Sequence, residues 1–256
     1  MNNPNTEVST RFFSRDFPST TEVEWKASLD TYYPMGFISF IEATLDSGDL
    51  PSLTRTKRLG QRCVSMSYQY LIHNYYGYRD KEEDLKQAFV LIELAGGNVF
   101  APHIKLDTRS RNDTNTILKR QESKPGIKSF RPLSEVPAFI KDFGDKTGLE
   151  TEFIGTMSRE RVGTFITTDD DRNWSLVADH VRPLDDTATL GLSQVELEYK
   201  GRSGVWLEEN PLYQQEAVEK LYETGSALVE FTGVLRPTSE TKFEWLKNYN
   251  ENSASR

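Results

Sequence analysis

Two short segments of the chain carry glutamate, glutamate and lysine at alternate positions, a spacing that could support chemistry. They read Glu22-Val23-Glu24-Trp25-Lys26 and Glu196-Leu197-Glu198-Tyr199-Lys200. Because the side chains of a β-strand point alternately to its two faces, each charged trio lies on one face if its segment is a strand. Pairs of glutamates supply the hard oxygen ligands that Mg²⁺ or Mn²⁺ prefers. One such strand is typical of a solvated surface, but the same order twice favours a metal site.

Basic residues with the same alternate spacing lie between these two segments. They are Lys105, Arg109 and Arg111 on one predicted strand, Lys119 after a short turn, and Arg159 and Arg161 on a later strand. Arginine holds phosphate oxygens with a bidentate fork, and lysine holds them as a point charge. Each set alone is typical of a solvated face, whereas the sets together predict a site for a polyanion.

Each acidic strand also has an apolar reverse side. The apolar positions are Val23, Trp25 and Ala27 in the first strand and Val195, Leu197 and Tyr199 in the second. A sheet that turned its charged faces inward would expose these apolar faces, which helices would then have to cover.

A charge pair at about 4 Å is worth about 4 kcal/mol at an effective dielectric of about 20, against about 1 kcal/mol in water. Burying so many like charges therefore requires a highly charged ligand to balance them.

The elements that position these residues are predicted from hydrophobic periodicity and turn residues. Strands are expected at about residues 21–27, 100–111, 116–121, 150–157, 161–168, 174–181, 194–200 and 226–233. Residues 35–97 are predicted to be largely helical, with an aromatic helix at 68–78 and another that an Asp80/Glu83 capping box opens. Further helices are expected at 134–143, at 210–225, where Gly225 ends the helix, and at 241–249. Because helices and strands are segregated, the sequence predicts an α+β protein with a largely antiparallel sheet.

In these motifs and their order, the chain resembles the CYTH superfamily, the triphosphate tunnel metalloenzymes. That family has a Glu-x-Glu-x-Lys strand, then an Arg-x-Arg strand, then a lysine, matched here by residues 22–26, residues 109–111 and Lys119. A later basic strand, an aspartate on the following strand and a Leu-Gly turn before a Glu-x-Glu strand are matched by Arg159-Glu160-Arg161, Asp179 and residues 190–198. Relatives of this kind include inorganic triphosphatases, thiamine triphosphatases and class IV adenylate cyclases.

The resemblance implies a closed antiparallel eight-stranded β-barrel, the triphosphate tunnel, with a charged interior and helices packed outside. The expected organisation is a flexible tail at 1–18, a single CYTH-like tunnel domain at 19–249 and a second flexible tail at 250–256. The helical stretch at about 32–97 departs from the family pattern and is interpreted as an insertion. It could cap one mouth of the tunnel, contact a nucleobase or bind a partner.

The resemblance also implies a role for each matched residue. The predicted catalytic residues are Glu22, Glu24, Lys26, Glu196 and Glu198. The predicted substrate-binding residues are Lys26, Arg109, Arg111, Lys119, Arg159 and Arg161. The predicted ligands of Mg²⁺ or Mn²⁺ are Glu22, Glu24, Asp179, Glu196 and Glu198.

These roles predict a metal-dependent hydrolase of a triphosphate-containing substrate, inorganic triphosphate or a nucleoside triphosphate, with in-line water attack on the terminal phosphorus. A class IV-type adenylate cyclase, which makes cyclic AMP and pyrophosphate from ATP, uses the same phosphate cradle and is the first alternative. The second alternative is a non-catalytic module that binds a nucleotide or polyphosphate. The four retained glutamates favour an enzyme, because a pure binder does not need them.

Composition narrows the remaining function classes. The net charge of −8 argues against a basic membrane patch and makes long nucleic acid an unlikely partner, so the expected partner is a triphosphate or nucleotide small molecule. The single cysteine, Cys63, excludes an internal disulfide and any multi-cysteine metal site. The three histidines, His73, His103 and His180, are interpreted as structural, with His180 beside Asp179. The polar start and the lack of a long apolar run predict a cytoplasmic protein, and a homodimer is left open.

Overall fold

The fold was obtained as a computed structural model. It describes residues 20–30, 33–50, 52–56, 58–59, 62–63, 65–79, 84–94, 96–106, 117–123, 130–185, 191–202, 205–206 and 211–254. The strands are β1 (Thr20–Leu29), β2 (Leu53–Arg55), β3 (Arg58–Leu59), β4 (Arg62–Cys63), β5 (Ser67–Arg79), β6 (Leu85–Leu94), β7 (Val99–Leu106), β8 (Ile117–Ser123), β9 (Arg131–Pro132), β10 (Thr151–Thr168), β11 (Arg172–Pro183), β12 (Leu192–Arg202), β13 (Val205–Trp206) and β14 (Leu235–Pro237). The α-helices are α2 (Pro34–Ser47), α3 (Val136–Thr147), α4 (Pro211–Thr232) and α5 (Lys242–Ala254), and a 3₁₀ turn, Leu133–Glu135, precedes α3. The described chain is therefore a mixed α+β protein, as predicted.

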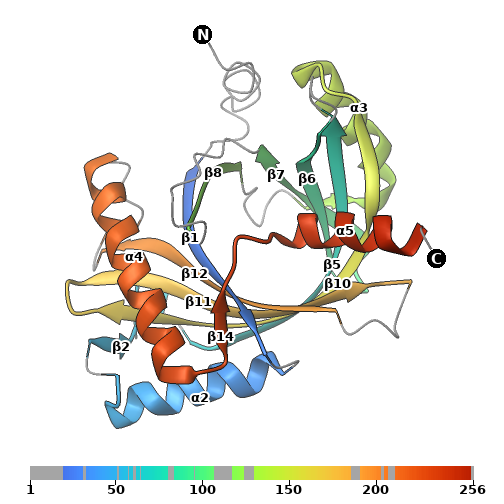
Figure 1. The fold of residues 1–256 in the computed structure, drawn as a ribbon. Helices are drawn as coiled ribbons and strands as arrows, with labels where there is room; N and C mark the ends of the chain where they lie inside the picture. The colour runs from blue at the N-terminus through green and yellow to red at the C-terminus, as the bar shows by residue number, and fades with distance from the viewer. Residues whose placement is uncertain are drawn as a thin grey trace.

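One large antiparallel sheet dominates the molecule (Figure 1). Its path of hydrogen-bonded strands runs β12-β11-β10-β5-β6-β7-β8-β1. β1 also pairs with β12, with Glu24 opposite Glu198 and Lys26 opposite Glu196. These eight pairings therefore run in a cycle, called here the strand ring. Its β1–β12 pairing joins the earliest and the latest long strands of the chain.

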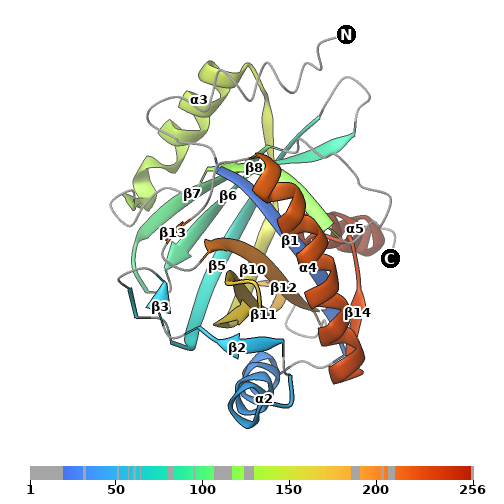
Figure 2. The same cartoon turned by 90° about the vertical axis from the view of Figure 1, so that its left-hand side faces the viewer.

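The outer face of the strand ring is apolar where β1 and β12 meet. Trp25 and Leu197 are 1% and 0% exposed and belong to one core cluster with residues of α2 and α4. Figures 1 and 2 show these two helices on the outside of the sheet. Burial of this apolar surface stabilises the fold and leaves the alternate, charged positions of the same strands facing inward. On these two strands the helices therefore cover the apolar face, and the charged positions lie on the opposite face of the sheet.

A second apolar cluster lies under α3. Phe139 and Phe143 of that helix pack edge-on against Phe89 of β6, with ring centroids 5.1 and 4.8 Å apart. Tyr78, Phe100 and Ile104 complete the buried part of the cluster on neighbouring strands. α3 therefore covers the β5–β6–β7 side of the sheet from outside, as α2 and α4 cover the other side.

α5 differs from the other helices because it packs against the charged side of the sheet. Phe243 and Leu246 are buried with Met157 of β10 and Val181 of β11. Met157 and Val181 each lie two residues from a charged inward residue, Arg159 and Asp179, and so share its face. Figure 1 shows α5 crossing β5 and β10. The helix therefore closes off part of the inner surface.

The secondary structure predicted for residues 32–97 is largely wrong. Among the residues described in this range, only Pro34–Ser47 forms a helix, whereas Ser67–Arg79 and Leu85–Leu94 are the long strands β5 and β6. β5 contains five tyrosines and an isoleucine, and β6 contains a phenylalanine, a valine and an isoleucine. These residue types favour a pleated, half-buried surface over a helix. The capping-box residues 80–83 lie outside the described residues. This segment supplies two members of the strand ring.

The C-terminal part of the chain also differs from the prediction. α4 continues through Gly225 to Thr232, so the predicted strand at 226–233 is helix. A Cβ atom at position 225 would lie 2.5 Å from Trp25 Cε2, so glycine is needed there for close packing and does not end the helix. The helix ends at Gly233, where φ is +65° and the amide donates to the Val229 carbonyl oxygen. α5 runs to Ala254, into the predicted tail at 250–256, and Asn250 Nδ2 donates to the Ile154 carbonyl oxygen over 2.8 Å.

Candidate functional site

The Asp179 carboxylate is the centre of a buried group of charges. Arg159 and Arg161, which share one face of β10, each place a guanidinium fork on it, with donor–acceptor distances of 2.7–3.0 Å. Lys242 of α5 adds an ammonium 2.9 Å from Asp179 Oδ2. Asp179 is fully buried, and its position opposite Arg161 in the β10–β11 register explains why the two meet. Three cations therefore share this one carboxylate.

Glu196 of β12 is the second buried carboxylate of the group. Lys242 Nζ lies 2.6 Å and Lys26 Nζ 3.2 Å from its Oε1 atom, and Arg161 donates to Oε2 over 2.6 Å. The Lys26 contact follows directly from the register, since Lys26 stands opposite Glu196 across the β1–β12 pairing. Lys242 and Arg161 thus bridge the two carboxylates, and Lys26 joins the group from β1.

Glu24 and Glu198 lie beside this group, opposite each other in the same register. Glu24 is 2% exposed and its Oε1 atom lies 3.1 Å from Lys26 Nζ, while Glu198 forms an ion pair with Lys200. Like charges directly opposite each other on adjacent strands repel. This pair of glutamates is therefore a place where added positive charge would be favourable.

The surroundings fix the charge state of the group. Burial alone would raise the pKa of Glu196, but the ammonium groups of Lys242 and Lys26 outweigh it and hold that pKa well below its usual value. Burial also opposes the charge of Arg161, yet Asp179 and Glu196 hold the pKa of Arg161 above its usual value. Both side chains are therefore charged throughout the physiological range.

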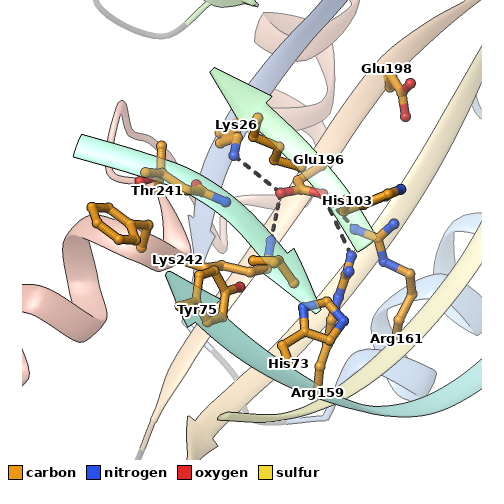
Figure 3. A pocket seen from close by; sticks show the side chains of 14 residues that line it. Lys26, His73, Tyr75, His103, Arg159, Arg161, Glu196, Glu198, Thr241 and Lys242 are labelled. Atoms are coloured by element: carbon orange, nitrogen blue, oxygen red, sulfur yellow. Dashed lines mark hydrogen bonds and ion pairs between the residues drawn. The ribbon is translucent and has the colours of Figure 1, made fainter. Parts of the chain in front are cut away.

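A cavity opens beside these charges (Figure 3). About 570 Å³ of space lies between the atoms that line it, open solvent included. Its charged lining comprises Lys26, Lys105, Arg159, Arg161, Lys242, Glu196 and Glu198. Five basic side chains thus face two acidic ones, and the cavity suits an anion.

The predicted site residues divide into three sets. Those that the structure brings together at the cavity or next to it are Glu24, Lys26, Arg159, Arg161, Asp179, Glu196 and Glu198, of which Glu24 and Asp179 contact lining residues without lining the cavity themselves. Glu22 and Lys119 are members of β1 and β8, but their side chains lie outside the described part of the structure. Arg109 and Arg111 fall wholly outside the described residues, so the Arg-x-Arg prediction stays a prediction.

Sequence reasoning missed Lys242 and the cavity positions of His73 and His103. Lys242 is the first residue of α5, which Thr241 and Glu244 cap through reciprocal bonds of 3.1 and 2.8 Å. A lysine in the first turn opposes the helix dipole, and this mismatch was a signal that could have been found in the sequence. His180, by contrast, contacts Ser193 over 2.9 Å and does not line the cavity, because it alternates with Asp179 along β11.

The described acidic residues fit the predicted metal only in part. No group of three or more His, Cys, Asp or Glu side chains is arranged to hold a metal ion among the residues that the structure describes. Asp179 and Glu196 have their oxygens engaged by arginine and lysine, which makes them poor cation ligands as arranged. The opposed pair Glu24 and Glu198 offers two hard oxygen donors, and each of the two carboxylates forms an ion pair with one lysine.

Comparisons with known proteins identify similar solved structures but no family. No protein-family model matches the chain, and no curated protein matches it in sequence. The PH1819 protein from Pyrococcus horikoshii OT3 is similar over 89% of this chain and 99% of that chain, with 13% identity and a TM-score of 0.45. The S. pombe Pct1 RNA triphosphatase in complex with the Spt5 CTD covers 98% of this chain and 89% of its own, with 8% identity and a TM-score of 0.29. A second structure of the S. pombe Pct1 RNA triphosphatase gives the same coverage at 10% identity, with a TM-score of 0.28.

Within the described residues, no helix has both the length and the apolar character needed to cross a membrane.

Proposed function

We propose that this protein binds a triphosphate-containing small molecule in the cavity and hydrolyses it in a metal-dependent reaction, and that the strand ring encloses the binding site as a tunnel. The observation that carries the proposal is the excess of cations on a buried surface. Five basic side chains line the cavity with two acidic ones, and three of these five share the single neighbouring carboxylate of Asp179. A surplus of buried positive charge is costly unless an anion compensates it.

The same geometry favours a polyanion over a single phosphate. Lys26 approaches from β1, Arg159 and Arg161 from β10, and Lys242 from α5, so cations reach the cavity from several sides. Charge-assisted bonds from several directions add up only for a ligand with many oxygens. The ordered sequence motifs shared with the triphosphate tunnel metalloenzymes agree with this choice.

Glu24 and Glu198 are the residues that we propose hold the divalent ion, with Glu22 as the third predicted ligand. When bound, Mg²⁺ or Mn²⁺ would neutralise phosphoryl oxygens and make water a better nucleophile. The chain itself contributes the fixed cations, which neutralise charge on the phosphoryl group, and buried carboxylates that hold those cations in place. Asp179 belongs to this second category in the proposal, and not to the metal ligands as the sequence predicted.

The test is a substrate panel with product identification. Inorganic tripolyphosphate, ATP and other triphosphates are incubated with Mg²⁺, with Mn²⁺ and with EDTA. Release of orthophosphate with either metal and none with EDTA is the expected result. Cyclic AMP with pyrophosphate from ATP would identify a cyclase instead.

Glu24→Gln tests the metal assignment separately, because it keeps the side-chain volume and removes the anionic charge. We expect turnover to fall roughly 100-fold or more while tripolyphosphate still binds. Turnover equal to that of the wild type at saturating Mg²⁺ would remove Glu24 from the reaction.

A non-catalytic binding module is the second candidate, and one observation favours it. Asp179 and Glu196 are engaged by cations and Glu24 is paired with Lys26, so the described carboxylates are largely neutralised by the chain itself. Tight tripolyphosphate binding with no product under either metal would establish this alternative.

A further inference from the structure

The imidazole of His73 in the cavity wall has a buried nitrogen atom to which no role in the site has been assigned. His73 of β5 is 3% exposed and lines the cavity, and its Nε2 atom has no hydrogen-bond partner among the residues that the structure describes. A buried imidazole nitrogen without a partner is costly, and such atoms in folded proteins generally have a reason. The position is fixed by register, since His73 stands between Met157 of β10 and Ile92 of β6.

His73 is uncharged in this setting. Burial lowers the pKa of His73 to about 3. His103 acts in the same direction, Asp179 opposes it, and Arg161 and Lys242 have smaller lowering effects on this pKa. A neutral imidazole has one nitrogen that donates and one that accepts. The ring can therefore present an N–H to the cavity without adding to its positive charge.

The surroundings of His73 decide which kind of ligand it meets. Arg161 and Lys242, two charged groups of the lining that act on His73, carry only donors, so they cannot accept a bond from the ring. They would also repel a metal ion placed at the imidazole. An anionic oxygen satisfies both requirements, because it accepts from the ring and is attracted by the cations.

The ring also marks one limit of the cavity. It contacts Tyr75 with ring centroids 6.0 Å apart, and Tyr75 in turn contacts Phe243 of α5 at 6.4 Å. This apolar wall continues into the buried cluster of α5. His73 therefore lies where the charged part of the cavity meets its apolar wall, and a bound anion can approach it only from the charged side.

We propose that His73 donates a hydrogen bond from Nε2–H to an oxygen of the polyanion bound in the cavity, and that it is a ligand-contacting, specificity-determining residue of this site. The inference rests on the proposed polyanion binding. It adds an uncharged donor to the five basic side chains of the lining. A donor of this kind favours a ligand with an oxygen at that one point over anions of equal charge that lack it.

His73→Gln and His73→Asn form the matched test, because glutamine places an amide N–H near the position of Nε2 and asparagine does not reach it. Tripolyphosphate binding is measured by calorimetry with Ca²⁺, together with thermal melts of the free proteins. We expect His73→Asn to weaken binding roughly 10- to 100-fold, as for a lost bond to a charged oxygen, and His73→Gln to stay close to the wild type. His180→Asn is the control, since His180 lies outside the cavity lining, and it should bind as the wild type does.

The outcomes separate this inference from the proposed function. Wild-type protein that fails to bind tripolyphosphate would overturn the proposed function, and this inference with it. Wild-type binding with equal affinity in His73→Asn would overturn only the role of His73. Equal losses in His73→Asn and His73→Gln, with a lower melting temperature for both free proteins, would show that the ring is structural.

A measurement on the wild type covers the case in which the variants do not fold. With ¹⁵N-labelled histidine, the Nε2 signal of His73 should move to that of a hydrogen-bonded N–H when tripolyphosphate is added, and stay fixed when Ca²⁺ is added alone. A shift with Ca²⁺ alone would mean a metal ligand, and no shift with either would remove the contact.

Discussion

Trp25 and Lys26 are neighbours on β1, and both are almost completely buried, at 1% and 2% exposure. Trp25 points outward into the apolar cluster beneath α2 and α4, and Gly225 of α4 leaves room for its ring. Lys26 points inward between Glu24 and Glu196. Equal burial therefore has two different meanings along one strand. The outer face stabilises the fold, and the inner face holds charges ready for a ligand.

Trp25→Ala should produce the largest effect and should act on stability alone. Replacing a fully buried tryptophan by alanine costs about 3–5 kcal/mol, because apolar contacts are lost and a cavity remains. Denaturant unfolding measures the loss, and tripolyphosphate affinity of the folded fraction should not change. Tyr222→Ala is the control, since Tyr222 of α4 is 48% exposed and its loss should change stability by no more than about 0.5 kcal/mol. A tenfold loss of tripolyphosphate affinity in Trp25→Ala would contradict the assignment of stability to the outer face of β1 and ligand binding to its inner face.

Lys26→Met should show the opposite pattern. Methionine keeps the length of the side chain and removes its charge, while Glu196 retains Lys242 and Arg161. Tripolyphosphate affinity should fall roughly 10- to 100-fold, the value of a charge-assisted bond, and stability should fall less than in Trp25→Ala. Calorimetry and denaturant unfolding on the same preparations provide both numbers. Unchanged affinity would place Lys26 among the purely structural ion pairs.

The pH dependence of stability should come from the inner face. The pKa of His73 is lowered to about 3 by burial, below its ordinary value of 6.5, so the unfolded chain takes up a proton that the folded protein excludes. Stability from the neutral ring is therefore complete above pH 6.5 and falls by about 1.4 kcal/mol per pH unit below it. The pKa of His180 is also lowered by its burial and by Arg182, so the difference between wild type and His73→Asn isolates His73. Unfolding at pH 7, 6 and 5 should give a flatter profile for His73→Asn, and parallel profiles would contradict the burial of a neutral ring.

Gly225→Ala should give the smallest effect and sharpen the description of the outer face. The added Cβ would lie 2.5 Å from Trp25, an overlap that costs about 1–3 kcal/mol, whereas alanine in a helix gains up to about 1 kcal/mol over glycine. We expect a net loss of about 1 kcal/mol. Gly144→Ala is the matched control, because position 144 of α3 meets only the Leu149 carbonyl oxygen at 3.4 Å, and this variant should be more stable than wild type. A gain in stability in both variants would mean that the Trp25 ring can move away from the added Cβ atom at little cost.

The sequence predicted the strands that carry the site better than the segments around them. β1 and β12 were predictable because charged and apolar residues alternate along them without interruption, and this alternation also predicted which face lies inward. β5 was not predictable, because tyrosines occur on both of its faces, with Tyr70 43% exposed and Tyr75 4% exposed. Its sequence therefore lacks the alternation of apolar and polar residues that identifies a strand. The place of Lys242 could not be predicted, since its partners Asp179 and Glu196 come from distant strands.

The pairing of β1 with β12 has a consequence for how the chain folds. Residues 30–191 lie between these two strands, so β1 cannot find its second neighbour until most of the protein has been synthesised. Contacts between such distant parts of the chain give a high contact order, which slows folding. Until then the growing chain has an open strand edge that carries Glu24 and Lys26 among its residues, and such charges discourage pairing with other chains. The residues that later meet at the seam of the sheet thus also protect the nascent protein before that seam exists.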